Sequence, residues 1–164
     1  MKMGFDFLKD KFIEGDEAKV DEQGRFILPI QFKKVLIEYY SPQLYLCCLD
    51  NEKIDMYPMS VYEKLVKDIL KLKEFDPVRR DFIRKLLDGK VITLDSRGRV
   101  AIPPHLRQRV GIGEKVKIVS QITFLELWDL EHYKQKEENA PISDEQLRIL
   151  NDKLYQLERR DGGT

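Results

Sequence analysis

A motif that occurs twice is the feature that most constrains the fold of this 164-residue chain. The two copies, residues 20–33 and 94–107, are related by a constant shift of 74 positions. Four positions hold the same residue in both copies, namely Asp21 and Asp95, Gly24 and Gly98, Arg25 and Arg99, and Pro29 and Pro103. The apolar and basic positions around them match in kind, so the sequence predicts two copies of one structural unit.

Each copy is expected to form a strand, a tight turn, a second strand and one short helical turn. In Asp-x-x-Gly the carboxylate can accept backbone N–H groups two residues on, and glycine adopts a positive φ at low cost. Alternating apolar residues resume after the arginine, as a strand with one buried face requires. The proline then ends the strand and is tolerated in the first turn of a helix. In the second copy residues 105–109 would fill that turn, with Gly111 just after its end.

The arginine that follows each turn is the candidate functional group. Arg25 and Arg99 would each be held out at the tip of a loop, where the guanidinium is open to a partner. The alternative is a purely structural role, in which Asp95 and Arg99 form an ion pair that only stiffens the turn. Two copies, each followed by a strand and a proline, argue against a chance match, but a purely structural repeat stays open.

The pattern Asp-x-x-Gly-Arg-hydrophobic-x-hydrophobic-Pro resembles the AbrB-type swapped-hairpin barrel. Two copies in one chain resemble the MraZ family of bacterial transcriptional regulators. The resemblance covers residues 12–134 and is closer in the second copy, through residues 111–116 and 125–128. In that family the Asp-x-x-x-Arg loops contact DNA and the protein assembles into rings. These expectations carry over to Asp21 and Arg25 and to Asp95 and Arg99.

The resemblance implies an α+β fold, a double-ψ-like or swapped-hairpin β-barrel formed by two tandem AbrB-type repeats with flanking helices. The two halves would interleave their hairpins. The first strand is expected at residues 12–20, and the hairpins at 44–57 and 116–128. The expected divisions are a leader at 1–11, a first repeat at 12–62, a helical spacer at 63–90, a second repeat at 91–134, and a C-terminal helix and tail at 135–164.

Capping signals predict helices in the spacer and the tail. Residues 60–63 match a capping box, and Asp76-Pro77 supplies an N-cap followed by a proline at the first helical position. The residues expected to face inward in the spacer are Val61, Leu65, Ile69, Leu72, Val78, Phe82 and Leu86. A second capping box at 143–146 opens a helix with a leucine stripe, which is too short for an independent coiled coil. That helix is expected to dock on its own barrel or on a neighbouring subunit.

Charge is balanced overall but is distributed unevenly. A formal net charge of zero argues against a generally basic nucleic-acid binder. Residues 94–109 nevertheless carry a net +3 and residues 19–34 a net +2, whereas residues 1–18 carry −2 and residues 126–164 carry −4. Local basic patches are the footprint of phosphate binding. The first loop has Glu22-Gln23 where the second has Ser96-Arg97, so it is expected to contribute less.

These residues divide into two expected roles. Arg25 and Arg99 are candidates for base readout, because a guanidinium can donate two hydrogen bonds to guanine O6 and N7. The candidates for phosphate contacts, which position the protein without specifying sequence, are Lys19, Lys33, Arg97, Arg107 and Arg109. With few such contacts on one protomer, useful affinity would depend on several loops meeting tandem DNA repeats at once.

Other classes of protein find little support in the sequence. There is no P-loop, nucleophile elbow or dinucleotide-binding glycine pattern, and no apolar run long enough for a membrane span. His105 and His132 are far apart and have no cysteine at ligand spacing. His105 is expected to be a surface or capping residue, with a phosphate contact as the functional alternative. Adjacent Cys47 and Cys48 would face opposite ways in a strand, so reduced packing residues are expected.

The residues argue against an enzyme, and no cofactor, metal or small-molecule substrate is expected; the resemblance implies a sequence-specific DNA-binding transcriptional regulator. By resemblance it would bind tandem promoter repeats of the division and cell-wall gene cluster. The expected partners are double-stranded DNA and further copies of the chain in a homo-oligomeric ring, in the cytoplasm and at the nucleoid. Two alternatives remain: an AbrB-type antitoxin or protein-binding module, whose C-terminal extension grips a toxin, and a ring scaffold without a nucleic-acid role.

Overall fold

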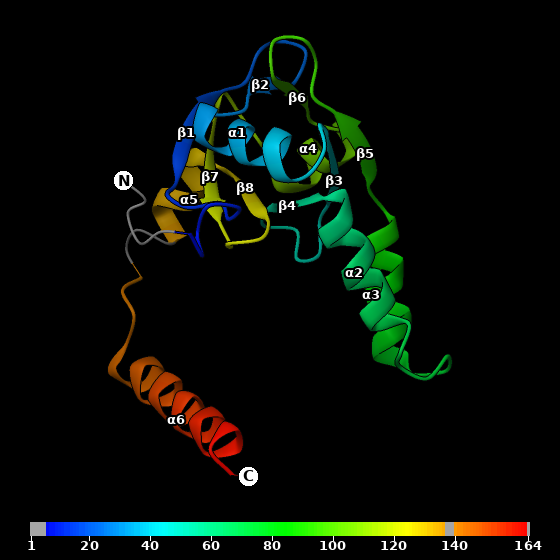
Figure 1. The fold of residues 1–164 in the computed structure, drawn as a ribbon. Helices are drawn as coiled ribbons and strands as arrows, with labels where there is room; N and C mark the ends of the chain where they lie inside the picture. The colour runs from blue at the N-terminus through cyan, green and yellow to red at the C-terminus, as the bar shows by residue number, and fades with distance from the viewer. Residues whose placement is uncertain (1–5, 137–139, 164) are drawn as a thin grey trace. The chain divides into compact units, whose positions relative to one another are not determined.

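A computed structural model of the chain describes residues 6–136 and 140–163 (Figure 1). The chain divides into two compact units, Met1–His132 and Tyr133–Thr164. Of the expected leader, residues 1–5 lie outside the described residues.

The first unit combines antiparallel strands with helices, which confirms the α+β class. The strands are β1 (Asp16–Lys19), β2 (Arg25–Ile27), β3 (Gln43–Cys47), β4 (Ile54–Pro58), β5 (Lys90–Thr93), β6 (Arg99–Ala101), β7 (Lys115–Ser120) and β8 (Leu125–Asp129). Its helices are α1 (Ile30–Tyr39), α2 (Met59–Ile69), α3 (Pro77–Leu87) and α4 (Pro104–Val110). Helix α5 (Leu130–Lys136) contains the boundary between the units, and the second unit holds α6 (Asp144–Asp161).

The two sequence copies pair with each other rather than folding side by side. One sheet has the order β1-β7-β8-β4-β3-β5, and β2 pairs with β6 in a separate two-stranded ribbon. Strands β1 to β4 of the first copy correspond to β5 to β8 of the second. The β1–β7 and β5–β3 pairings are therefore equivalent, while β2–β6 and β4–β8 each join two corresponding strands. This is a pseudo-twofold arrangement with interleaved hairpins.

The closed barrel expected from the sequence is not reproduced by the strand pairings in the described part of the chain. Strands β1 and β5 form the two edges of the six-stranded sheet. Short links connect each edge to the ribbon: Val20 bridges Phe26, and the Asp95 N–H donates to the Arg99 carbonyl at 3.3 Å. The ribbon is thus attached to both edges of the sheet without completing a continuous ladder.

The main core draws on both copies. Phe26, Phe32, Leu36, Val100 and Leu106 are all almost completely buried in one cluster with the inward residues of the sheet. Because β2, β6, α1 and α4 all contribute to this cluster, neither copy has a core of its own. The two loops that precede β2 and β6 are therefore held by a shared interior.

The spacer helices differ from the expected pattern. Helix α2 begins at Met59 directly after β4, with Pro58 as N-cap and no side-chain cap, so the capping box expected at residues 60–63 is wrong. Val78, Phe82 and Leu72 are about half exposed, and the prediction that they face inward is also wrong. The helices lie side by side and extend away from the sheet (Figure 1), and their buried residues Tyr62 and Leu86 form a second cluster with Tyr45 of β3. There the Tyr62 ring stacks on Tyr45, at 3.8 Å between centroids.

The first copy also departs from its expected boundaries. Glu14 has a φ of 66°, which interrupts extended backbone, and Phe12 makes only an isolated bridge to Ile122. The strand expected at residues 12–20 therefore shrinks to β1. Helix α1 has ten residues rather than one short turn, because Leu36 continues the buried face that Phe32 begins.

Several local predictions are confirmed. The Asp76 carboxylate caps α3 by accepting from the N–H groups of Val78 and Arg79, and Ser143 forms a capping box at the start of α6. Gly111 ends α4 in the left-handed conformation. Cys47 and Cys48 are buried and free. Among the described residues there is no helix with both the length and the apolar character needed to cross a membrane.

Candidate nucleic-acid interface

The first Arg-bearing loop is organised by one carboxylate. Asp21 Oδ1 accepts hydrogen bonds from the backbone N–H of Gln23 at 3.0 Å and of Arg25 at 2.9 Å. Its Oδ2 accepts from Arg25 Nε at 2.9 Å. Gly24 has a φ of 76°, as the tight turn requires. The turn chemistry predicted from Asp-x-x-Gly is confirmed.

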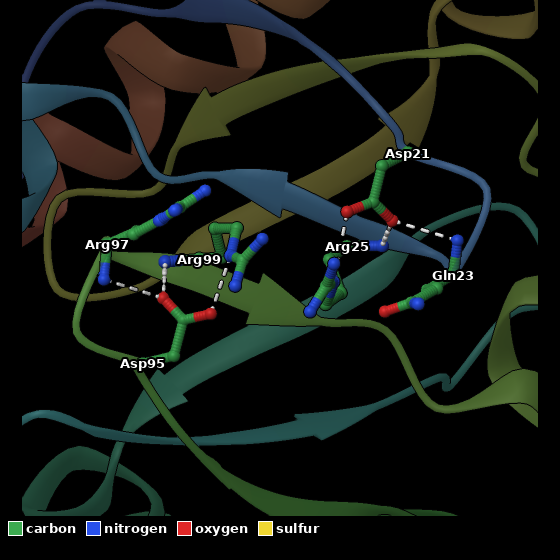
Figure 2. Close-up of polar contacts among 6 residues, drawn as sticks. All are labelled: Asp21, Gln23, Arg25, Asp95, Arg97 and Arg99. Atoms are coloured by element: carbon green, nitrogen blue, oxygen red, sulfur yellow. Dashed lines mark hydrogen bonds and ion pairs between the residues drawn. The ribbon is translucent and has the colours of Figure 1, made fainter.

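The second loop repeats the same contacts (Figure 2). Asp95 Oδ1 accepts from the backbone N–H groups of Arg97 and Arg99, both at 2.9 Å, and Oδ2 accepts from Arg99 Nε at 2.6 Å. Gly98 has a φ of 72°. The Arg99 backbone and side-chain donors hold the pKa of Asp95 at about 2, and the Arg25 donors lower the pKa of Asp21. Both carboxylates therefore stay ionised near neutral pH and keep their arginines in place.

Pairing of β2 with β6 places both arginines on one face. Arg25 lies opposite Ala101 and Arg99 opposite Ile27, while Phe26 lies opposite Val100. Side chains alternate between the two faces of a ribbon, so the burial of Phe26 and Val100 directs Arg25 and Arg99 outward together. Figure 2 shows both guanidinium groups between the two aspartates.

The braces leave part of each guanidinium open. Only Nε of Arg25 and of Arg99 is engaged by its aspartate. Within residues 6–136 and 140–163, the Nη atoms of neither arginine donate a hydrogen bond. The Arg25 and Arg99 side chains are 29% and 23% exposed to solvent. The free ends of both guanidinium groups are therefore accessible, while the hydrogen bond from Nε fixes their direction.

The loops are also tied to each other, which the sequence did not predict. The Leu28 N–H donates to the Gly98 carbonyl and the Ile102 N–H donates to the Gly24 carbonyl, both at 3.0 Å. A basic side chain from the opposite copy lies on each glycine. A Cβ added to Gly98 would come within 3.1 Å of Lys33, and one added to Gly24 within 1.9 Å of Arg107. The positive φ is what favours glycine at both turns, because the overlying lysine and arginine ends are flexible and could move aside.

Four of the predicted basic residues meet in one shallow hollow. Its lining consists of Lys19, Val20, Asp21, Arg25, Phe26, Ile27, Arg97 and Arg99. Lys33 and Arg107 do not line this hollow; they lie on the loop glycines instead. Exposed Ile27 and Ala101, which the sequence did not single out, share the outward face of the ribbon with the arginines.

Two residues on α4 have a different environment. Arg109 donates to Asp88 at 2.9 Å, and His105 lies 3.9 Å from the same carboxylate. Asp88 follows the end of α3, so this contact ties the spacer to α4. The described residues contain no group of three or more side chains suited to holding a metal ion.

Comparison with known proteins gives matches that all carry the name MraZ. A family model described as "MraZ protein, putative antitoxin-like" matches residues 87–151. A transcriptional regulator MraZ from Neisseria meningitidis is 35% identical over 119 residues, which cover 71% of this chain and 79% of the relative. The transcriptional regulator MraZ from Acidobacterium capsulatum is 28% identical over 134 residues, covering 81% and 92%. The one from Salmonella paratyphi A is 30% identical over 144 residues, covering 85% and 94%.

Proposed function

The chain belongs to the MraZ family, and from that premise we propose that it regulates transcription by binding double-stranded DNA in a sequence-specific way. The observation that carries this proposal is the shared outward face of Arg25 and Arg99 on the β2–β6 ribbon. The major groove of B-DNA admits a two-stranded β-ribbon. A ribbon that presents two oriented guanidinium groups has the shape and the donors for that groove.

In this proposal Arg25 and Arg99 read base edges, and their Nη donors are the groups that meet guanine. Asp21 and Asp95 position them, because each aspartate fixes both the turn and the Nε of its arginine. Ordering a long side chain on binding costs about 0.5–1.5 kcal/mol. The braces remove part of that cost before DNA arrives.

Lys19 and Arg97 lie beside the arginines and would contact phosphates on either side of the groove. Lys33 and Arg107 have a second role in this proposal, since each lies against the glycine of the opposite loop. They would add positive potential behind the loops and keep the two turns in register. The net charge of the whole chain is therefore less informative than the charge on this face.

The proposal also includes the finer architecture expected from the family. The sheet and ribbon would together form the swapped-hairpin barrel of two tandem AbrB-type repeats, at residues 12–62 and 91–134. Several copies would assemble into a ring, in the cytoplasm at the nucleoid, on promoter repeats of the division and cell-wall gene cluster. Simultaneous binding of several ribbons to tandem repeats would raise affinity by roughly 10²–10⁴.

Binding of a labelled promoter duplex tests the proposal. Each of Arg25→Ala and Arg99→Ala is expected to weaken binding about 5- to 150-fold, the loss of one bidentate base contact. Arg84→Ala is the matched control, because Arg84 is exposed on α3 and pairs with Asp81. The control is expected to bind as the unmodified protein does.

Two results would contradict the proposal. One is the absence of DNA binding by the unmodified protein at low salt, which would favour the antitoxin or scaffold alternative. The other is an equal loss of binding in all three variants, which would indicate a nonspecific charge effect. Unchanged melting temperatures would separate both results from unfolding.

A further inference from the structure

Helix α6 has an apolar stripe that no part of its own unit covers. It is eighteen residues long, begins with a full capping box and contains no buried residue. Leu147, Leu150, Leu154 and Leu157 are each about half exposed. An amphipathic helix gains most of its stability by packing its apolar face. The stripe therefore indicates a contact surface.

The spacing of the leucines defines heptad positions. Steps of three, four and three residues place Leu147 and Leu154 at a, and Leu150 and Leu157 at d. The residues at the flanking e positions are Asp144, Asn151 and Glu158, and those at the g positions are Gln146, Lys153 and Arg160. One side of the stripe is thus acidic and the other side is basic.

Several charges away from the stripe have contacts within the helix, whereas, among the described residues, those beside it do not. Arg148 pairs with Glu145 at 2.6 Å, and Arg159 lies 5.9 Å from the centroid of the Tyr155 ring. In contrast, neither Lys153 nor Glu158 has an ion-pair partner among the residues the structure describes. The unpaired charges flank the leucines, where a second helix would meet them.

We propose that α6 pairs with α6 of a second copy of the chain, in parallel and in register, as a short coiled coil. In a parallel pair a g residue faces the e residue five positions later on the partner helix, so Lys153 would meet Glu158 of the other copy. Gln146 would meet Asn151 in the same way. In an antiparallel pair g faces g and e faces e; with Leu147 opposite Leu157, Lys153 would meet Lys153 of the other copy and Asp144 would meet Glu158. Charge complementarity therefore selects the parallel orientation.

The α6–α6 contact would act together with a second interface between the copies rather than alone. Fewer than three heptads give a weak coiled coil in isolation. Joining copies at a second site makes the pairing effectively intramolecular and raises its local concentration. The α6 pair is independent of the DNA-binding proposal, because it involves neither the ribbon nor its arginines.

Disulfide trapping in the full-length protein tests the pairing and its direction. Leu157→Cys places one thiol at a d position, where parallel helices bring the two copies together. Gln156→Cys is the control on the outer face. The native Cys47 and Cys48 are buried, and burial raises the pKa of Cys47 to about 12, so background oxidation is expected to be low. Mild oxidation is expected to link Leu157→Cys chains into dimers and to leave Gln156→Cys chains unlinked.

Either of two results would overturn the proposal. Equal linking of both variants would show that the d position is not at a contact. Linking only when Leu147→Cys and Leu157→Cys proteins are mixed would show an antiparallel pair, in which the two Leu157 sites lie about 15 Å apart along the axis.

Charge reversal adds an orientation test in the Leu157→Cys protein. Lys153→Glu is expected to slow linking about two- to fivefold, the scale of an exposed ion pair. Adding Glu158→Lys is expected to restore the rate, since the pair is then reversed rather than lost. If Lys153→Glu leaves the rate unchanged, or if the double change fails to restore it, the assigned g–e contact is wrong.

Discussion

The duplication brings corresponding strands together at two places, and the carboxylates at these places have opposite surroundings. At the β2–β6 ribbon, Asp21 and Asp95 each bind their own arginine and two backbone N–H groups. At the β4–β8 seam, Asp55 lies directly opposite Glu126, and both are buried. At the ribbon each duplicated carboxylate is paired with an arginine of its own copy. At the seam the two corresponding carboxylates face each other.

The seam contacts are also repeated between the copies. Tyr57 O–H donates to Asp55 at 3.4 Å, and Trp128 Nε1 donates to Glu126 at 3.2 Å. Lys53 lies 3.8 Å from Glu126, and Asp55 Oδ1 has no hydrogen-bond partner among the described residues. Burial raises the pKa of Asp55 to about 6, Lys53 opposes the shift, and Glu126 adds to it. The comparison teaches that duplicating a carboxylate favours the folded state where the duplicated segment also contains a cation to pair with it, as it does at the ribbon and not at the seam.

The largest effect is expected from breaking the ribbon side of the comparison. Arg25→Ala combined with Arg99→Ala should weaken promoter binding about 10²- to 10⁴-fold, because two base contacts are lost. The same protein should keep its melting temperature close to that of the unmodified chain, since both side chains are at the surface. Anisotropy titrations and thermal melts check the two statements. A large loss of stability would mean that the arginines are mainly structural.

At the seam, Asp55→Asn is expected to stabilise the protein at pH 7.5 by roughly 1–3 kcal/mol, because the neutral amide avoids burying a charge. This is the free energy that corresponds to raising the pKa of Asp55 from 3.8 to about 6. The folded-state pKa of about 6 lies above the usual 3.8, so the folded protein binds this proton more tightly. The contribution of Asp55 is therefore most favourable below pH 3.8 and is lost as the pH rises through 6. Urea unfolding of both proteins at pH 4.5, 5.5, 6.5 and 7.5 measures the difference. A constant difference across these values would contradict the assignment.

The loop aspartates should show the opposite pH dependence. The pKa of Asp95 is lowered to about 2, so its contribution is present above pH 3.8 and is lost as the pH falls through 2. NMR titration of the carboxyl carbons should therefore find Asp95 well below Asp55. Asp95→Asn is expected to weaken DNA binding about two- to tenfold, because the freed Arg99 must be ordered on binding. Binding equal to that of the unmodified protein would show that the brace is unnecessary.

The smallest effect concerns the difference between the two loops. Gln23 in the first loop corresponds to Arg97 in the second. Gln23→Arg is expected to steepen the dependence of log K on log salt by about one, and Arg97→Gln to reduce it by about one. Binding titrations at several salt concentrations measure both slopes. No change in either slope would place these positions away from phosphates.

Sequence reasoning succeeded where the cause of structure is local. The turns at Asp21 and Asp95, the Asp76 cap and the Ser143 capping box depend on contacts within a few residues. The general interleaving of the hairpins followed from the family resemblance. The register that places Asp55 opposite Glu126 did not, because it is fixed by packing between segments 71 positions apart.

Solvent exposure was harder to predict than secondary structure. The apolar spacing of Val78 and Phe82 is correct for one face of a helix, yet only Leu86 on α3 meets a partner that buries it. The sequence likewise did not predict that Lys33 and Arg107 lie over the loop glycines. Each of these side chains reaches the loop of the opposite copy, and no pattern within a few residues of the sequence predicts a contact between segments so far apart.

Photo-crosslinking from position 27 tests the central claim most directly. Ile27 is 62% exposed and shares the outward face of the ribbon with Arg99. A photoreactive residue at position 27 is predicted to form an adduct with promoter DNA, and the same residue at exposed position 82 on α3 is not. An adduct from position 82 without one from position 27 would show that DNA lies elsewhere and would contradict the account.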